Sequence, residues 1–318
     1  MSLARRKITH LSIGNFNLDI TLYVDRIPGP DESVLASTIN VRPGGAATNY
    51  AVAVASYGHK PYLLATVSED ELVRRYLSMV EEAGVDVSLV QKIRGEPGIV
   101  VIFVYPGGER SMVKYPGVNS ALARLKIPLE VLERVQVVHI ASAPPSILSA
   151  IGDKAKGNAT LLSYDPGIHV NDFVEDNLRL LRFVDTLFLN KKEAKILLEK
   201  NNLDSVFAQG VKRVVVKAGS RGAYLLNPRG QVYLGACKIE EKVVDTTGAG
   251  DAFDAFFNAT LAETGDELLS IQHGVVAGAL KTLCRSSFIC FDKKVFNKYF
   301  GRSEVVEVGL DDFVADVT

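Results

Sequence analysis

One segment of the chain combines acids, hydroxyls and small residues in a pattern suited to phosphate chemistry. It reads Asp245-Thr246-Thr247-Gly248-Ala249-Gly250-Asp251, and a helical apolar pattern follows it. Gly248, Ala249 and Gly250 are therefore predicted at a helix N-terminus, where unpaired N–H groups and the helix dipole attract anions. Asp251 would stand in the first turn and accept a proton from an attacking hydroxyl. The residues alone leave open an ordinary glycine-rich helix start.

A base beside an anion site is the minimum equipment for phosphoryl transfer, which needs positioning and charge stabilisation more than covalent chemistry. Other nucleotide enzymes fit the sequence less well. The chain contains neither GxGxxG nor GxxxxGK[ST]. A nicotinamide-dependent dehydrogenase and a P-loop enzyme are therefore disfavoured.

Composition narrows the class of protein further. The 318 residues include 36 Lys+Arg and 37 Asp+Glu, so the net charge of −1 gives no reason to expect nucleic acid or an anionic membrane as a partner. No apolar run reaches the ~18–20 residues of a membrane helix. The basic start Met1–Lys7 lacks a following signal-type apolar core. These features predict a cytoplasmic protein.

Cysteine and histidine usage predicts neither disulfides nor zinc. The three cysteines Cys237, Cys284 and Cys290 form no CxxC pair, which favours free thiols in a reducing compartment. The five histidines are scattered and show no HExxH or Cys/His grouping.

Short apolar runs alternate with helical patterns along most of the chain. Strands are predicted at 10–14, 62–67, 135–141, 160–164, 186–189 and 213–216, and helices at 46–57, 69–83, 146–154, 172–181 and 192–200. Repeated βαβ units predict a three-layer αβα, Rossmann-like core with a mainly parallel sheet. Ligands of such sheets bind beyond the carboxyl ends of the strands.

The rest of the chain predicts a hairpin, a helix pair and a β-sheet lid. The hairpin spans 223–226 and 231–234, and the helices begin near Ala249 and span 267–283. The buried face of the first helix is predicted to consist of Phe253, Phe256, Phe257, Thr260 and Leu261. Two β excursions, 20–41 and 99–114 with a loop at 105–109, would form a lid within one domain, 1–318. Exposed lid edges would pair in a homodimer.

Four segments in this order resemble the ribokinase-like (PfkB) family of sugar and nucleoside kinases. Asp245–Asp251 with Ala252-Phe253 looks like its C-terminal signature, and Gly44-Gly45-Ala46-Ala47-Thr48-Asn49 like its N-terminal one. Asn190-Lys191-Lys192-Glu193 resembles its Asn-x-x-Glu segment, and Gly14–Asp19 its opening strand. The resemblance spans most of the chain and implies a ribokinase-like fold.

The resemblance also implies roles at the reacting centre. Asp251 would be the general base for the substrate's primary alcohol, and Gly248, Ala249 and Gly250 would hold the γ-phosphoryl charge of ATP. Asp19, Gly44, Gly45 and Asn49 would bind substrate hydroxyls. The alternatives are a turn residue for Asp19 and a helix N-terminal amide for Asn49.

On the nucleotide side, Asn190 and Glu193 would order Mg²⁺ through water, unless Glu193 only serves its helix dipole. Thr246 and the loop Lys217–Gly222, with Gly219, Ser220 and Gly222, would bind the nucleotide. Lys217 would add charge near the phosphates or simply end a strand. Phe256 replaces a small residue of the signature, and 283–292 lacks a family glycine, so adenine contacts, donor preference and K⁺ activation stay open.

Two further residues bear on the acceptor. Arg110 on the second lid hairpin would reach the substrate or be solvated. Asp165-Pro166-Gly167 is similar to archaeal nucleoside kinases and favours a nucleoside, although a sugar kinase of the ribokinase, fructokinase or 2-keto-3-deoxygluconate kinase type remains the alternative. A catalytically silent ligand sensor is the non-enzyme alternative.

Overall fold

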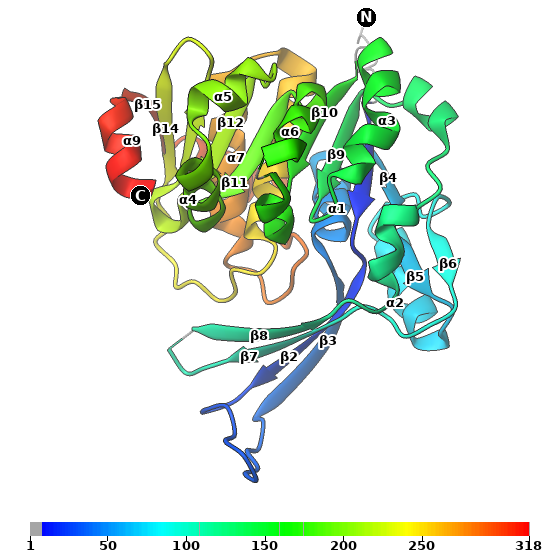
Figure 1. The fold of residues 1–318 in the computed structure, drawn as a ribbon. Coiled ribbons are helices and arrows are strands. Elements are labelled where there is room, and N and C mark those ends of the chain that lie inside the picture. Colours follow the sequence, from blue (N-terminus) through cyan, green and yellow to red (C-terminus); the bar gives the residue numbers. More distant parts are fainter. Residues whose placement is uncertain (1–7, 108, 159, 174, 318) are drawn as a thin grey trace, which may run out of the picture.

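The computed structural model describes residues 8–107, 109–158, 160–173 and 175–317 and has three layers, with helices on both faces of a large sheet (Figure 1). In these residues the sheet has nine strands, in the order β15-β14-β13-β12-β11-β10-β9-β1-β4. They are β1 (Thr9–Gly14), β4 (Lys60–Leu64), β9 (Val137–Ala141), β10 (Leu161–Asp165), β11 (Thr186–Asn190), β12 (Arg213–Lys217), β13 (Ala223–Leu226), β14 (Val232–Cys237) and β15 (Ser303–Val308). From β4 to β12 every pair is parallel, and β13 to β15 continue antiparallel. The predicted fold class is confirmed.

Alternating side chains of the central strands supply two separate cores. In β11, Leu187 and Leu189 face one layer of helices, and Phe188 faces the other. The first layer contains α3 (Ser146–Gly157), α4 (Lys191–Lys200), α5 (Leu203–Ala208) and α9 (Leu310–Val317). The second contains α1 (Ala46–Tyr57), α6 (Ala249–Thr264) and α7 (Glu267–Lys281), with α2 (Glu71–Glu82) and α8 (Lys293–Phe300) beside them.

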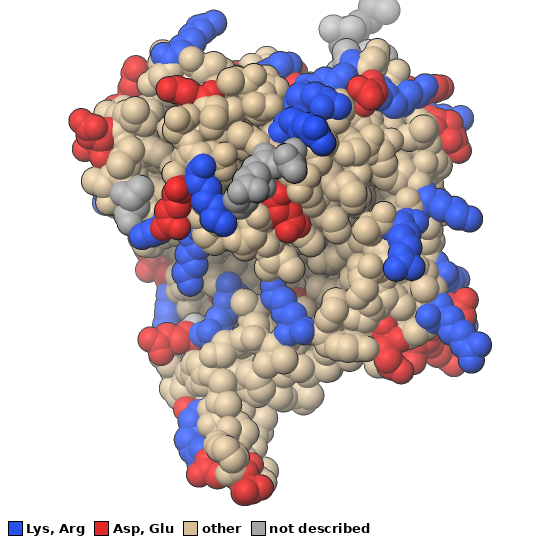
Figure 2. Space-filling model, viewed as in Figure 1, with Lys and Arg blue, Asp and Glu red and all other residues tan. Residues whose placement is uncertain are grey.

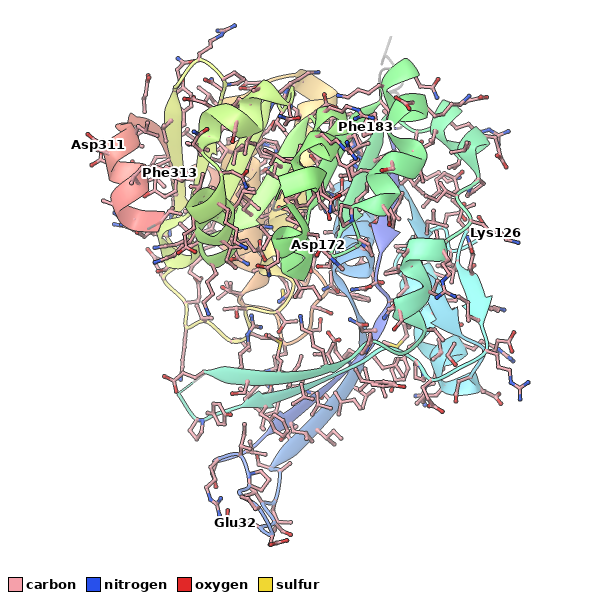
Figure 3. The ribbon with its side chains drawn as sticks, viewed as in Figure 1. Glu32, Lys126, Asp172, Phe183, Asp311 and Phe313 are labelled. Carbon is pink, nitrogen blue, oxygen red and sulfur yellow. A yellow bond between two sulfur atoms is a disulfide. The ribbon has the colours of Figure 1, made fainter. Side chains whose placement is uncertain are left out.

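A second, smaller sheet projects from the large one. Its strands β2 (Asn17–Tyr23), β3 (Thr38–Gly44), β7 (Ile99–Val104) and β8 (Arg110–Tyr115) pair in the order β3-β2-β7-β8. The chain enters it directly from the carboxyl end of β1, so this sheet lies at the ligand-binding edge of the large one (Figure 1). Glu32, in the β2–β3 loop, lies at its far tip (Figure 3). Both β excursions expected from the sequence thus join one sheet.

Several predicted elements differ from the observed ones. The strand predicted at 62–67 is divided between β4 and the short β5 (Thr66–Ser68), which pairs with β6 (Gln91–Ile93). In place of a helix at 172–181, 3-10 helices span Gly167–Phe173 and Glu175–Phe183; others span Gly117–Arg124, Leu129–Glu133 and Gly219–Arg221. Apolar residues three apart suit both helix types, so their spacing did not separate them.

The five residues predicted to form the buried face of α6 are all buried, but the prediction was too narrow, because every residue from Ala252 to Leu261 is buried. The sheet lies on one side of this helix, and α1 and α7 pack against it as well. The C-terminal elements α8, β15 and α9 were not anticipated; α9 packs Phe313 against Tyr224 of β13, with ring centroids 5.3 Å apart (Figure 3 labels Phe313).

The expectation of three free thiols is also wrong. The turn between α7 and α8 brings the Cα atoms of Cys284 and Cys290 to 5.7 Å, and a disulfide joins them, whereas Cys237 stays free. The basic start Met1–Lys7 and Gly108 of the hairpin loop lie outside the described residues. Among those described, no helix has the length and apolar character needed to span a membrane.

Candidate active site

The segment Asp245–Asp251 forms the N-terminus of α6, as its sequence indicated. Gly248 is the residue before the helix and has the left-handed φ of 79°. A Cβ there would lie 2.6 Å from the carbonyl oxygen of Ser287, so only glycine fits. No side chain of the described residues caps this helix end. The N–H of Ala249 donates to the carbonyl oxygen of Thr246 at 3.2 Å, and the next N–H groups of the first turn are available to an anion.

Asp251 stands in the first turn of α6 and is held from α1. The Nδ2 of Asn49 donates a hydrogen bond to its Oδ2 at 2.7 Å, while the Oδ1 of Asn49 is buried without a partner among the described residues. Burial raises the pKa of Asp251 to about 6, although the Asn49 hydrogen bond acts in the opposite direction. The side chain of Asn49 does not cap its own helix and is hydrogen-bonded to Asp251 instead.

Asp19 of β2 lies against the glycine pair that precedes α1. Its side chain is buried, and in the described part of the chain its Oδ1 has no hydrogen-bond partner. A Cβ at Gly44 would come within 2.1 Å of Asp19 Oδ2, and one at Gly45 within 2.3 Å of the carbonyl oxygen of Asn15. Burial, and then the charge of Asp251, raise the pKa of Asp19 to about 7.

Beneath the helix start, Lys217 forms a buried ion cluster with two acids. Its Nζ lies 2.7 Å from Oδ2 of Asp165 and 2.9 Å from Oδ2 of Asp254. A Cβ on Gly250 would lie 3.4 Å from the same nitrogen, so the ammonium is adjacent to the anion site. Burial alone would lower the pKa of Lys217, but Asp165 and Asp254 raise it. The sequence analysis did not identify Asp254, although an acid three residues after Asp251 on a helix predicted to be buried indicates a buried ion pair.

Two further cations approach the same segment. Arg110 of β8 donates to Oγ1 of Thr247 at 2.6 Å and lies 3.7 Å from Oδ1 of Asp245, so the small sheet touches the anion site. Lys281 of α7, which sequence reasoning missed, is buried and donates to the carbonyl oxygen of Asp245 at 3.2 Å. Burial lowers the pKa of Lys281 to about 8. Figure 2 shows Lys and Arg side chains around the hollow between the two sheets.

Asn190 and Glu193 form a capping box at the start of α4. Asn190 Oδ1 accepts from the N–H of Glu193 at 3.0 Å, and Glu193 Oε2 accepts from the N–H of Asn190 at 2.8 Å. Burial, and then the charge of Asp165, raise the pKa of Glu193. The side chain therefore serves its helix and also lies within the electrostatic reach of the Lys217 cluster.

The remaining residues predicted on the nucleotide side differ in exposure. Gly219 and Ser220 are exposed, as is Thr246. A Cβ on Gly219 would meet nothing within 4 Å, whereas one on Gly222 would lie 1.9 Å from the carbonyl oxygen of Gly235. Gly222 is thus required by the adjoining β14 strand.

Phe256 packs edge-on against Tyr57 with ring centroids 5.1 Å apart, and it also contacts Phe296 of α8.

Comparisons with known proteins agree with this fold. Residues 8–294 match the family described as pfkB family carbohydrate kinase. An ATP-dependent ribose-1-phosphate kinase of Halopiger xanaduensis is 34% identical over 275 residues, which cover 85% of this chain and 90% of that protein. A ribokinase of Lactococcus lactis is 28% identical, covering 84% and 88%. The solved nucleoside kinase of Methanocaldococcus jannaschii superposes with a TM-score of 0.83 at 22% identity, covering 94% and 99%.

A family match over most of the chain defines a phosphotransferase that acts on the hydroxyl of a sugar or nucleoside. The chain belongs to the pfkB family of carbohydrate kinases.

The Lys217 cluster yields a stability prediction. Lys217→Met should lower the free energy of unfolding by about 3–5 kcal/mol, because it leaves the buried carboxylate of Asp254 and the partly buried one of Asp165 without their cation. Urea unfolding measures the loss. The control is Lys191→Met, which removes a half-exposed partner of Asp316 and should cost less than about 1 kcal/mol. Equal losses in the two variants would contradict a structural role for the cluster.

Proposed function

We propose that this protein transfers the γ-phosphoryl group of ATP to a primary hydroxyl of a nucleoside or sugar, with Asp251 as the general base. The observation that carries the proposal is the bond from Asn49 to Asp251, which fixes a carboxylate beside an open helix N-terminus. The relatives are named for ribose 1-phosphate, ribose and nucleosides. All three acceptors contain a ribosyl group with a primary alcohol.

The acceptor would bind between α1 and the small sheet. The unpartnered oxygens Asp19 Oδ1 and Asn49 Oδ1 are acceptors that the secondary hydroxyls of a sugar would satisfy. Gly44 and Gly45 would bring the backbone before α1 close to Asp19 and to the carbonyl oxygen of Asn15, where any side chain would collide, and so help to form the acceptor site. A carboxylate with a pKa of about 6 is mostly ionised at neutral pH and still basic enough to take the hydroxyl proton.

The nucleotide would lie beyond the ends of β11 and β12. Gly248, Ala249 and Gly250 would bind the transferred group through N–H groups, and Lys217 would add positive charge below Gly250. Thr246 and the loop with Gly219, Ser220 and Gly222 would line the rest. The described residues hold no cluster of three acidic, His or Cys ligands, so Mg²⁺ would be held by phosphates and by water ordered at Asn190 and Glu193. When bound, Mg²⁺ neutralises charge on the β- and γ-phosphates.

Lys281 would act as a fixed cation at the anion site. Its ammonium contacts the carbonyl oxygen of Asp245 and lies near the charges of Asp245 and Asp251. A resident ammonium stabilises developing negative charge without reorganisation.

The small sheet would act as a lid within a single domain, formed from 20–41 and 99–114. Arg110 already connects this lid to Thr247, so the lid would cover the cleft while in contact with the anion site. Ile20 follows Asp19 on β2, so its side chain points to the opposite face of the small sheet, away from the cleft. The residues paired with it across the sheet are also apolar: Val41, Val101 and Val113. Ile39 and Val113 are 59% and 61% exposed. A second copy of this chain, always present at equal concentration, would cover this face as a homodimer.

Asp251→Asn should lower kcat by roughly 10²–10⁴-fold, because the amide cannot take the hydroxyl proton. A coupled assay of ADP release, with ATP and ribosyl acceptors, measures the loss. An unchanged circular dichroism spectrum and Tm would show that folding is intact. Turnover close to the wild-type value would refute Asp251 as the base.

The pH profile of kcat/KM should be bell-shaped. Activity should rise through about pH 6–7, as Asp251 and Asp19 lose protons, and fall above about pH 8, as Lys281 loses its charge. Lys281→Arg should move the alkaline limb upward, because arginine stays charged. An alkaline limb that is the same in Lys281→Arg and wild type would exclude Lys281 as its origin.

The lid dimer can be tested by light scattering after size exclusion. The wild type should have the mass of two chains, and Val113→Lys should shift it toward one chain, because a charge would be buried in the apolar contact. Leu35→Lys, at a 94% exposed position in the β2–β3 loop, is the matched control and should keep the dimer. A monomeric wild type would refute the dimer.

A further inference from the structure

We propose that the acceptor already carries a phosphate group, remote from the hydroxyl that reacts, and that Lys114 and Arg42 of the small sheet bind it. The inference rests on the proposed function, because it concerns the acceptor of the same site. It names the substrate class as sugar phosphates, in preference to free sugars and nucleosides.

The strand register places both cations beside Asp19. Asp19 is directly opposite Arg42 on β3 and Val100 on β7, and Val100 is directly opposite Lys114 on β8. Residues opposite one another in a sheet point to the same face. Asp19 faces the cleft, since its carboxyl lies against Gly44 and is influenced by the charge of Asp251. Arg42 and Lys114 therefore face the cleft as well.

These cations have no protein counterion. Within the described residues, no carboxylate forms an ion pair with Arg42 or Lys114, and both side chains are exposed. The charge of Lys114 nevertheless lowers the pKa of Asp19, against the stronger effect of burial, so the two groups are close. With strands about 4.8 Å apart, Arg42 is one strand from Asp19 and Lys114 is two. Their long side chains can converge on a group held beside that carboxylate.

The nucleotide phosphates do not account for this pair. Arg110 and Lys281 already serve that end of the site, through Thr247 and Asp245. Arg110 lies four residues before Lys114 on the same strand, which is about 13 Å along β8. Arg42 and Lys114 thus lie at the acceptor end, around the residue proposed to hold the sugar hydroxyls.

A general need for surface charge does not account for Arg42 and Lys114 either, because the small sheet has its apolar side chains on the outward face and its charges on the face toward the cleft. Its outward rung is Val41–Ile20–Val101–Val113, and its cleft-facing rung carries the charges. A neutral acceptor would leave two cations under a closed lid without compensation, which is costly. A phosphate monoester supplies the missing negative charge and accepts charge-assisted hydrogen bonds from lysine and arginine.

The reaction balances with such an acceptor. The hydroxyl oxygen of the sugar phosphate forms a bond to the γ-phosphorus of ATP, and the bond from that phosphorus to the β–γ bridging oxygen breaks. The hydroxyl proton goes to Asp251. The products are ADP and a sugar bisphosphate.

The experiment compares kcat/KM of the full chain for ribose 1-phosphate, ribose and a nucleoside such as adenosine, with ATP as donor. Each presents a free primary hydroxyl. We expect the phosphorylated acceptor to be favoured by about 10²-fold or more, the contribution of two charge-assisted contacts. The preference should shrink as ionic strength rises.

Lys114→Met should reduce the ratio of kcat/KM for ribose 1-phosphate over ribose by about tenfold or more, and Lys114→Arg should retain most of it. Lys126→Met, at an exposed lysine away from the cleft (Figure 3), is the control and should keep the wild-type ratio. Equal use of neutral and phosphorylated acceptors, or a ratio unchanged in Lys114→Met, would overturn this inference and leave the proposed function standing. No phosphorylation of any acceptor would overturn both.

Discussion

The buried ammonium of Lys217 is the interaction on which the geometry of the site depends. Asp165 ends β10, Lys217 ends β12, and Asp254 lies in α6, so one cation joins two strands to the helix that carries Asp251. A buried charge is tolerated only with close partners, which fixes these three side chains tightly. Asp254 follows Asp251 by three residues, so holding it sets the rotation of α6 and with it the direction of Asp251.

One turn beyond Asp254 on the same face of α6, Asn258 makes further polar contacts inside the core. Asn258 donates to Oγ of Ser163 on β10 at 2.8 Å and to the hydroxyl of Tyr50 on α1 at 3.1 Å. Asp251, Asp254 and Asn258 therefore form a polar stripe along the first part of a helix that is buried from Ala252 to Leu261. Because each of these three side chains has a specific partner on α1 or on the sheet, α6 can pack against them in only one register. The bond between Asn49 and Asp251 is a consequence of that register.

Local patterns predicted the framework because they act over short distances. The α1 boundaries followed from Gly44-Gly45 and Gly58, and the anion site followed from the glycines before α6. The contacts that complete the site join residues far apart in sequence: Arg110 meets Thr247 across 137 positions and Lys217 meets Asp254 across 37. Helical or strand periodicity carries no information on such pairs. The Cys284–Cys290 bridge joins residues only six apart and was missed for a different reason, because it depends on how one irregular turn folds back.

The large sheet and α6 thus position Asp251 at an uncapped helix N-terminus, and the small sheet presents Arg42, Asp19 and Lys114 on one face toward the cleft. The central claim is transfer of phosphate from ATP to a primary hydroxyl beside Asp251. Phosphorus-31 NMR of the product formed from ATP and a ribosyl acceptor tests it most directly. The account predicts a new phosphomonoester whose phosphorus couples to the two protons of a CH₂ group. Release of inorganic phosphate alone, or coupling to a single ring proton, would contradict it.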